Sequence, residues 1–152
     1  MAFPSSGLFV PTFVSALNGG IVLDLDLLTH KVALYTNAVT GADLTTDTAY
    51  NAGAWLSSSN EVVGTGYTAG GYTLANTTFL HTAAGVVVWT NTVNPNWTTA
   101  TITARGGLYY ADALAGNNAI VAQTFGADIT STAGTFTIQI AAGGIFSIDF
   151  VP

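Results

Sequence analysis

Alternation of apolar and polar residues dominates the second half of the chain. The segment 135–140, TFTIQI, would place Phe136, Ile138 and Ile140 on one face of an extended strand. The segment 146–150, FSIDF, repeats this pattern after a pair of glycines. β-branched and aromatic residues fill such runs, and Gly and Asn occupy the intervals between them. Because turn signals recur about every 8–12 residues, we predict an antiparallel β-sandwich or small barrel.

The first half of the chain has a less regular pattern. Residues 31–36, KVALYT, are predicted to form a strand. Residues 21–28, IVLDLDLL, also alternate with a period of two, which predicts a second strand, with a short helix as the alternative. Residues 41–59 have no clear period and predict a long loop with one helical turn, which Tyr50 and Trp55 would fasten to the body.

The N-terminal segment predicts a short helix. Residues 11–20, PTFVSALNGG, put Pro at a first helical position and an Asn-Gly-Gly stop signal at the end. Apolar side chains at helical spacing are expected to share one face: Phe13, Val14 and Leu17. We therefore divide the chain into an N-terminal arm, residues 1–20, which is extended or short-helical, and a β domain, residues 21–152.

Two glycine-containing segments carry further information. Residues 60–74 read NEVVGTGYTAGGYTL, and within them residues 64–69 match a relaxed dinucleotide-binding fingerprint. Such a site needs a helix directly after the glycines, and the Thr- and Gly-rich continuation is a poor helix start. We instead predict a bulged or closely packed β segment that turns at residues 70–71 and continues as a strand. A second pair of glycines, at residues 106–107, is expected to interrupt a strand.

Charge and composition narrow the possible functions. Only 7% of the residues are charged and 49% are hydrophobic, so we expect a hydroxyl-rich protein that assembles with partners. The net charge is −6, and Lys31 and Arg105 are the two cationic side chains, which argues against binding to nucleic acids or anionic membranes. No apolar run approaches the ~20 residues of a transmembrane helix. The absence of cysteine excludes disulfides and thiolate chemistry.

Candidate catalytic and metal-binding residues are few. His30 and His81 are the two histidines, and metal binding would require both together with an Asp. Asp24 and Asp26 would lie ~7 Å apart on one strand face, a spacing compatible with a carboxylate pair or, with His30, a hydrolase site. A solvated strand face explains these aspartates more simply, so we expect no catalytic residue, no metal and no cofactor.

Aromatic residues are candidates for two different roles. They are suited either to stacking against a glycan or to anchoring a core or interface, and the scarcity of charge favours the second role. The residues concerned are Trp55, Tyr67, Tyr72, Trp89, Trp97, Tyr109 and Tyr110.

Three ordered motifs resemble a group of small structural proteins of tailed bacteriophages. They are the strand KVALY at Lys31–Tyr35, the Asp-x-x-Tyr loop end at Asp47–Tyr50, and the segment NEVVGTGYTAGG at Asn60–Gly71. Together they cover a quarter to a third of the chain. The resemblance implies a non-enzymatic virion component, assembled in the host cytoplasm: a head-decoration protein, a tail-associated protein or a small fibre protein.

Within this group, composition favours a capsid decoration or cement protein on the outer head surface. Its partners would be the major capsid protein or other virion proteins and identical copies, with a homo-oligomer such as a trimer. The alternative is a tail or fibre protein that binds a host receptor or glycan. The residues expected at the interface are Phe3, Leu8, Phe9, Phe13, Tyr50 and Trp55, because they belong to apolar segments without a strong strand pattern.

Overall fold

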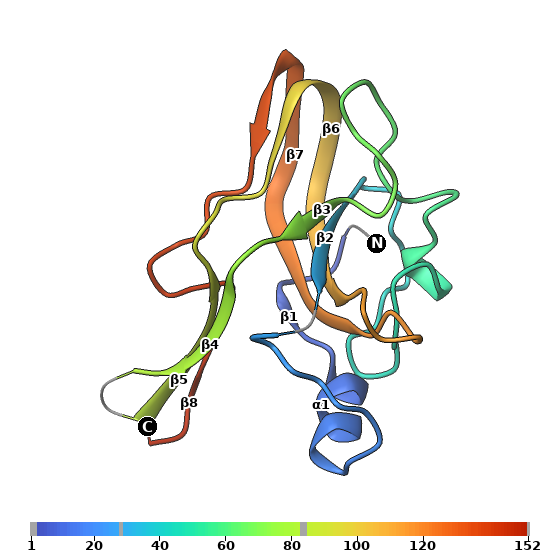
Figure 1. Ribbon diagram of the computed structural model, residues 1–152. Helices are drawn as coiled ribbons and strands as arrows, with labels where there is room; N and C mark the ends of the chain where they lie inside the picture. The colour runs from blue at the N-terminus through green and yellow to red at the C-terminus, as the bar shows by residue number, and fades with distance from the viewer. Residues whose placement is uncertain (1–2, 28, 83–84, 152) are drawn as a thin grey trace.

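The computed structural model describes residues 3–27, 29–82 and 85–151 of the chain. It has two antiparallel sheets and one short α-helix near the N-terminus (Figure 1). The larger sheet has the strand order β1-β7-β6-β2-β3, and the smaller one has the order β4-β5-β8. The predicted class, mainly β and sandwich-like with a short-helical N-terminal segment, is confirmed.

The elements follow the chain in this order: β1 Gly7–Leu8, α1 Val10–Leu17, β2 His30–Tyr35, the 3-10 helix η1 Gly53–Trp55, β3 Tyr72–Leu74, β4 Thr77–His81, β5 Val86–Asn91, β6 Asn96–Ala111, β7 Ala119–Thr137 and β8 Phe146–Asp149. The helical turn predicted within residues 41–59 is therefore η1, and the strand predicted at residues 31–36 is β2.

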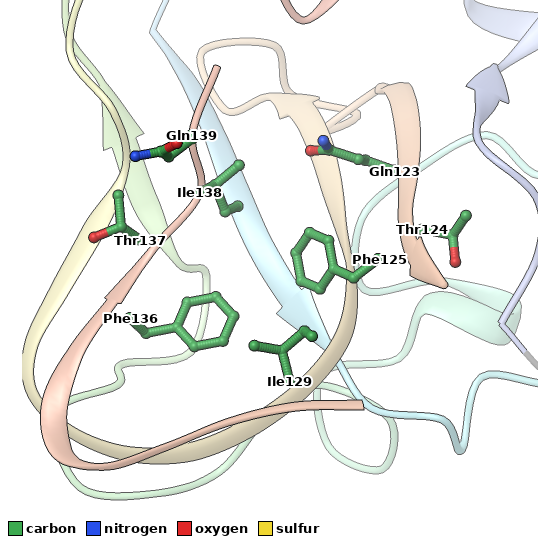
Figure 2. Close-up of a pocket in the computed structure, with 8 residues that line it drawn as sticks. All are labelled: Gln123, Thr124, Phe125, Ile129, Phe136, Thr137, Ile138 and Gln139. Carbon is green, nitrogen blue, oxygen red and sulfur yellow. The ribbon is translucent and has the colours of Figure 1, made fainter. Parts of the chain in front are cut away.

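A long, bent hairpin of β6 and β7 forms the centre of the larger sheet (Figure 1). Ala104 pairs with Ile129 and Gly106 with Thr124, so five steps along β7 oppose two steps along β6. Gly126 lies in this bulge with a φ of +76°, a conformation that glycine adopts without steric cost. Bulges of this kind bend the strand that carries them. Beyond the bulge, β7 curls round between Ile129 and Phe136 (Figure 2).

The expected interruption of β6 at its glycine pair does not occur. Gly106 and Gly107 both pair with β7 inside a continuous strand. A Cβ atom at Gly106 would lie 2.4 Å from the ring of Phe3, so this glycine makes room for a packed aromatic side chain. The prediction was wrong because glycine in a strand can serve a close contact as well as a break.

The smaller sheet projects from the body as a separate arm, which we call the β4–β5–β8 arm (Figure 1). At its base, Trp89 of β5 is fully buried and its indole N–H donates to the carbonyl of Leu25 at 3.0 Å. Phe146 of β8 makes an edge contact with Phe13 of α1, with ring centroids 5.9 Å apart. These contacts fix the base of the arm to the body, while its far end is exposed.

Strand β2 separates two hydrophobic cores. Val32 and Leu34 belong to the larger core between the sheets, and Ala33 and Tyr35 belong to a second core on the opposite face. Because both faces of β2 are covered, its sequence is almost continuously apolar instead of alternating.

Residues 25–27 form a turn and residues 21–24 are irregular, so the strand predicted over 21–28 is wrong; Leu28 lies outside the described residues. The carboxylate of Asp24 accepts hydrogen bonds from the backbone N–H groups of Asp26 and Leu27, at 3.0 and 2.9 Å. A short polar side chain that bonds to the backbone nearby stabilises a turn in competition with a strand. Leu25 points into the core, whereas Leu27 is exposed.

The N-terminal segment is packed onto the larger sheet. Leu8 of β1 pairs with Val121 of β7, and the hydroxyl of Thr12 in α1 donates to the carbonyl of Ala119 at 2.5 Å. Phe13 is partly buried, but Val14 and Leu17, which the helical spacing groups with it, are exposed. Among the described residues, no helix has the length and apolar character needed to cross a bilayer.

Candidate functional site

The glycine-rich segment, residues 60–74, lies against the backbone of the larger sheet. A Cβ atom added to Gly64 would lie 2.3 Å from the carbonyl oxygen of Thr101 in β6. One added to Gly71 would lie 2.0 Å from the carbonyl oxygen of Val32 in β2, and Gly71 has a φ of +77°. These glycines therefore permit backbone-to-backbone contact, as the sequence predicted.

The chain turns after these glycines and returns as a strand. The N–H of Gly71 bonds to the carbonyl of Thr68 at 3.0 Å, and residues 72–74 then form β3, antiparallel to β2. Residues 60–82 are all described and contain no helix, so the geometry of a pyrophosphate site is absent from them.

A buried carboxylate organises this segment. Glu61 is only 3% exposed. Its Oε1 atom accepts hydrogen bonds from the Tyr67 hydroxyl at 2.6 Å and from the Gly70 N–H at 2.7 Å, and its Oε2 atom accepts one from the Tyr50 hydroxyl at 2.9 Å. These three donors compensate for the loss of water around the carboxylate. We call the group Tyr50, Glu61, Tyr67 and Gly70 the Glu61 clasp.

The Glu61 clasp joins the three motifs on which the phage resemblance rests. The Tyr67 hydroxyl, which donates to Glu61, also accepts a hydrogen bond from the Leu34 N–H of β2 at 2.9 Å. Tyr50, at the end of the second motif, stacks on Tyr110 of β6 with ring centroids 4.4 Å apart. Residues far apart in sequence therefore meet in one polar cluster whose immediate role is to fix the long loop to the sheet.

Burial and the charge of Glu61 raise the pKa values of the two tyrosines of the clasp. Burial, followed by the hydrogen bond to Glu61 and its negative charge, raises the pKa of Tyr50 to about 12. Burial and the charge of Glu61 also raise the pKa of Tyr67 well above its ordinary value. Both phenols are therefore protonated at neutral pH and act as hydrogen-bond donors.

Three of the predicted interface residues are buried within the protein itself. Phe3, Phe9 and Tyr35 surround Trp55 with edge-on ring contacts at centroid distances of 5.6, 5.6 and 5.2 Å. The Trp55 indole N–H donates to Asp47 Oδ2 at 3.0 Å. Phe3, Phe9 and Trp55 are buried because a second core forms on the face of β2 opposite the larger one, and Trp55 thereby fixes the long loop to the body, as the sequence predicted. The participation of these three residues in an interface stays a prediction.

The other predicted interface residues are partly buried and already make contacts within the chain. Leu8 pairs with β7, Phe13 packs against Phe146 of the arm, and Tyr50 belongs to the Glu61 clasp. The structure thus assigns these side chains structural contacts, and their participation in an interface stays a prediction.

The candidate metal and hydrolase residues do not converge. His30 is buried in β2 with its ring 5.2 Å from that of Trp89, whereas His81 is exposed at the end of β4. Asp24 stabilises the turn described above, and Asp26 accepts a hydrogen bond from the Phe79 N–H. In the described parts of the chain, no group of three or more acidic or histidine side chains is placed to hold a metal ion.

The indole rings do not form a surface for stacking against a glycan. Trp55, Trp89 and Trp97 are all buried, and Trp97 packs among Tyr67, Tyr72 and Phe136. The hypothesis of a surface patch built from these tryptophans is therefore wrong, since their rings are needed to fill the cores.

Large apolar side chains are exposed at several places in the described residues, among them the helix α1. Val10, Val14 and Leu17 are exposed along α1 at positions i, i+4 and i+7, which places them on one face of the helix. We call them the α1 stripe. The helix lies where the sequence predicts it, but its outward face is not evident from the sequence, because spacing alone does not say which side of a helix meets the body.

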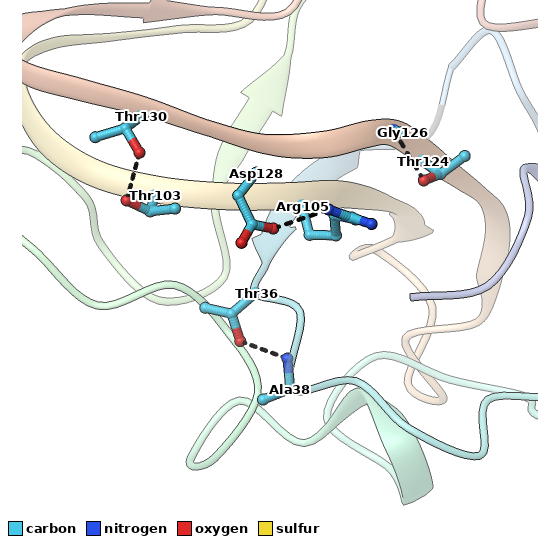
Figure 3. A network of polar contacts seen from close by, with 8 residues as sticks. All are labelled: Thr36, Ala38, Thr103, Arg105, Thr124, Gly126, Asp128 and Thr130. Atoms are coloured by element: carbon cyan, nitrogen blue, oxygen red, sulfur yellow. Dashed lines mark hydrogen bonds and ion pairs between the residues drawn. The ribbon is translucent and has the colours of Figure 1, made fainter. Parts of the chain in front are cut away.

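Part of the β6–β7 hairpin carries a surface rich in hydroxyl-bearing side chains. Figure 3 shows Thr103 and Thr130 joined by a hydrogen bond of 2.8 Å, close to the ion pair of Arg105 and Asp128 at 3.3 Å. A neighbouring groove of about 290 Å³ is lined by mostly hydroxyl-bearing side chains: Thr36, Val63, Thr101, Ile102, Thr103, Thr130 and Ser131.

Both cationic side chains of the chain are engaged in ion pairs. Lys31 Nζ lies 3.0 Å from Asp112 Oδ2, and Arg105 is paired with Asp128. Neither cation is therefore left to offset the surplus of negative charge.

Comparisons with protein families, with curated proteins and with solved structures found no match to this chain.

Proposed function

We propose that this protein is a non-enzymatic structural component of a tailed bacteriophage virion, and that it decorates or cements the outer surface of the head. The observation that carries this proposal is the α1 stripe. Leu17 is 87% exposed, and Val10 and Val14 flank it on the same helix face. Apolar surface contributes roughly 25 cal/mol per Å² when it is removed from water, so a partner that covers the stripe gains affinity from it.

The distribution of charge supports an outer position on the particle. The net charge is −6, and both cations are already paired, so the chain has no basic surface for packaged DNA. Neutral apolar and hydroxyl-bearing side chains are left to make contacts. Such a protein binds its neighbours through shape and apolar area more than through ion pairs.

The protein would stabilise the head by making contacts across the border between neighbouring capsid subunits. A head filled with DNA is under internal pressure, which favours separation of neighbouring capsid subunits. A protein that buries apolar surface across a subunit border lowers the free energy of the closed shell relative to the ruptured one. The hydrogen bond from Thr12 to the Ala119 carbonyl and the burial of Phe9 would hold α1 against the sheet, which reduces the entropy lost on attachment.

Purified virions provide the direct test. We expect mass spectrometry to find the protein in hundreds of copies per particle and cryo-electron microscopy to place it on the outer head. Density confined to the tail would contradict the head position, and absence from the particle would contradict the proposal as a whole. Virions carrying Leu17→Ser should release the protein more readily than virions carrying Leu27→Ser, a matched change at a residue that is 85% exposed outside α1.

The hydroxyl-rich groove supports one alternative, a tail or fibre protein that binds a host glycan. Thr101, Thr103 and Thr130 offer neutral donors and acceptors that suit the hydroxyl groups of a sugar. The isolated protein would then retain glycans on an array, and Thr103→Val would weaken retention. Lack of retention together with a head position in the virion would exclude this alternative.

A further inference from the structure

A pocket lies inside the curl of β7 (Figure 2). It has a volume of about 330 Å³, at the lower end of the range for pockets that hold a small ligand or a side chain. Its apolar side chains come from both sides of the curl: Phe125 and Ile129 from one, Phe136 and Ile138 from the other. All the residues that line it are uncharged, so it is suited to an uncharged apolar group. We call it the β7 pocket.

Strand β7 has one open edge. On one side it pairs with β6 along most of its length. On the other side β1 pairs with Val121 and Ala122, and the Thr124 N–H donates to the Ser6 hydroxyl at 3.0 Å. Beyond Thr124, no strand within the described residues pairs with this side of β7. An edge of this kind presents backbone N–H and C=O groups that another chain can bind.

The hydrogen bonds at the end of β7 identify the backbone groups that face the open edge. The Ile138 N–H donates to the Pro95 carbonyl at 2.9 Å, so Ile138 directs its N–H toward the side of β6. Residues of an antiparallel pair alternate between bonded and non-bonded positions, so Thr137 and Gln139 direct their backbone groups to the other side. Both residues are exposed, and among the hydrogen bonds of the described residues none involves the backbone of Gln139.

The open edge and the β7 pocket adjoin each other. Thr137 and Gln139 line the pocket although their side chains point away from it in Figure 2, so their backbone atoms form part of its border. The side chains of Phe136 and Ile138, which alternate with them, are buried and form its floor. The edge thus offers main-chain hydrogen bonds to an added strand, and the pocket offers a place for one of its side chains. Sheets bind extended peptides by this combination.

We propose that the open edge of β7 binds an extended, basic segment of a different virion protein. The segment adds a strand beside residues 135–139 and inserts one large apolar side chain into the β7 pocket. This inference rests on the proposed function as an assembling protein, and it adds a second contact to that made by the α1 stripe.

Two observations select this occupant. The outward backbone groups of Thr137 and Gln139 alternate with the β6-facing groups of Ile138, which matches the alternation of an extended peptide backbone. The net charge of −6 and the pairing of both cations favour a basic partner over a second copy, which would be repelled. Asp128, whose side chain is 51% exposed, lies next to Ile129 of the pocket lining and gives this preference a local source.

Two substitutions at one position separate the backbone donor from the side chain. Gln139→Pro removes an N–H that makes no bond within the described residues, whereas Gln139→Ala keeps the N–H and removes the carboxamide. The probe is a capped synthetic peptide in which Val alternates with Thr, with Phe at the centre and Lys at both ends. By calorimetry we expect Gln139→Pro to bind it about tenfold more weakly, and Gln139→Ala to bind it like the unmodified protein.

Further changes test the pocket and the charge. Ile129→Asp, at a residue that is 44% exposed, and a peptide with Ala in place of its Phe should each weaken binding at least about tenfold. A peptide methylated on the backbone nitrogens that face the edge should not bind, and one with Glu in place of Lys should bind more weakly. Circular dichroism would verify the folding of the variants, and Ile129→Gln replaces Ile129→Asp if the latter does not fold.

Purified heads that lack the protein extend the test to the particle. When the protein binds them, hydrogen exchange at the Thr137 and Gln139 amides should slow. Attachment without this slowing would reject the added strand and leave the proposed function standing. Peptide binding without attachment to heads would contradict the proposed function and leave the peptide site standing.

Three results with the isolated protein would overturn the inference: no binding of the Phe-containing peptide, equal binding by Gln139→Pro and Gln139→Ala, or equal binding of the methylated peptide. Light scattering tests the remaining occupant. An oligomer of the unmodified protein that Gln139→Pro dissolves would identify a second copy at the edge and overturn the choice of a basic partner.

Discussion

The hydroxyl of Tyr67 donates a hydrogen bond of 2.6 Å to the buried carboxylate of Glu61 while accepting one of 2.9 Å from the Leu34 N–H. This relationship joins the glycine-rich segment to the central strand β2. Tyr67 can serve both partners because a phenol has one donor and free acceptor capacity. The Glu61 clasp therefore holds this segment in place by hydrogen bonds, in addition to the apolar packing of the two hydrophobic cores.

Replacing Glu61 by Gln should destabilise the protein by about 1.5–3 kcal/mol, the contribution of hydrogen bonds to a charged group. Gln retains the shape but loses the negative charge and one acceptor, so one of the three donors is left unsatisfied. Urea unfolding measures the change. Asp128→Asn, which breaks an exposed ion pair, is the control and should cost less than about 1 kcal/mol. Equal losses for the two variants would contradict a special role for Glu61.

Gly71→Ala should be far more disruptive than Gly41→Ala. Both glycines have positive φ, +77° and +71°, so both substitutions carry the left-handed backbone cost of roughly 1–2 kcal/mol. A Cβ at Gly71 would lie 2.0 Å from the Val32 carbonyl oxygen, whereas one at Gly41 meets nothing within 4 Å. The difference between their free energies of unfolding isolates the backbone contact. Similar values would show that the close approach of Gly71 to β2 is unimportant for stability.

The sequence predicts those parts of the fold that depend on residues close together in the chain. It does not predict the parts that depend on residues far apart in the chain. Period-two alternation located β8 and the end of β7, and the glycines of residues 60–74 indicated close packing, because these signals are local. The turn at Asp24 was missed since its side-chain bonds compete with a strand that the same pattern predicts. The second core around Trp55 was missed as well, because it joins residues from Phe3 to Ala122 that no local pattern connects.

In the candidate site too, the sequence predicts local features and does not predict contacts between residues far apart in the chain. Motif spacing drew attention to residues 60–71, but it gave no sign that Glu61 would be buried among Tyr50, Tyr67 and Gly70. A lone acidic residue followed by two valines was the available signal. The pocket lined by Phe125 and Phe136 has no sequence signature at all, since it forms where β7 curls between these two residues (Figure 2).

Alkaline pH should weaken the protein in a window set partly by Tyr50. Its pKa is raised to about 12 by burial and by Glu61, while an unfolded tyrosine has a pKa of about 10. The folded state therefore holds this proton more tightly. The contribution to stability is fully present below about pH 10 and is lost as the pH rises toward 12.

Urea unfolding between pH 9 and 12 measures this effect. Tyr50→Phe should make the loss of stability with pH less steep, and Glu61→Gln should shift the Tyr50 contribution toward pH 10. The other buried tyrosines also make the free energy of unfolding of the unmodified protein depend on pH. The contribution of Tyr50 is therefore the difference in this pH dependence between the unmodified protein and the variant. An unchanged slope in Tyr50→Phe would show that folding does not raise the pKa of this phenol.

Apolar residues of the N-terminal segment have two different roles. Phe9 packs in the core, whereas Leu17 is exposed and is proposed to contact a partner. Phe9 is fully buried against Trp55, so Phe9→Ala should cost about 3–5 kcal/mol of stability. Leu17 is exposed, so Leu17→Ser should change stability by less than about 0.5 kcal/mol.

Binding to the partner should show the reverse order, because only Leu17 offers its side chain to another molecule. The measurement is cosedimentation with purified heads that lack the protein, performed at a temperature where both variants remain folded. Loss of binding with Phe9→Ala but not with Leu17→Ser would mean that the N-terminal segment detaches from the body and inserts its buried aromatic side chains into the partner. Such a result would replace the α1 stripe by the aromatic interface that the sequence predicts.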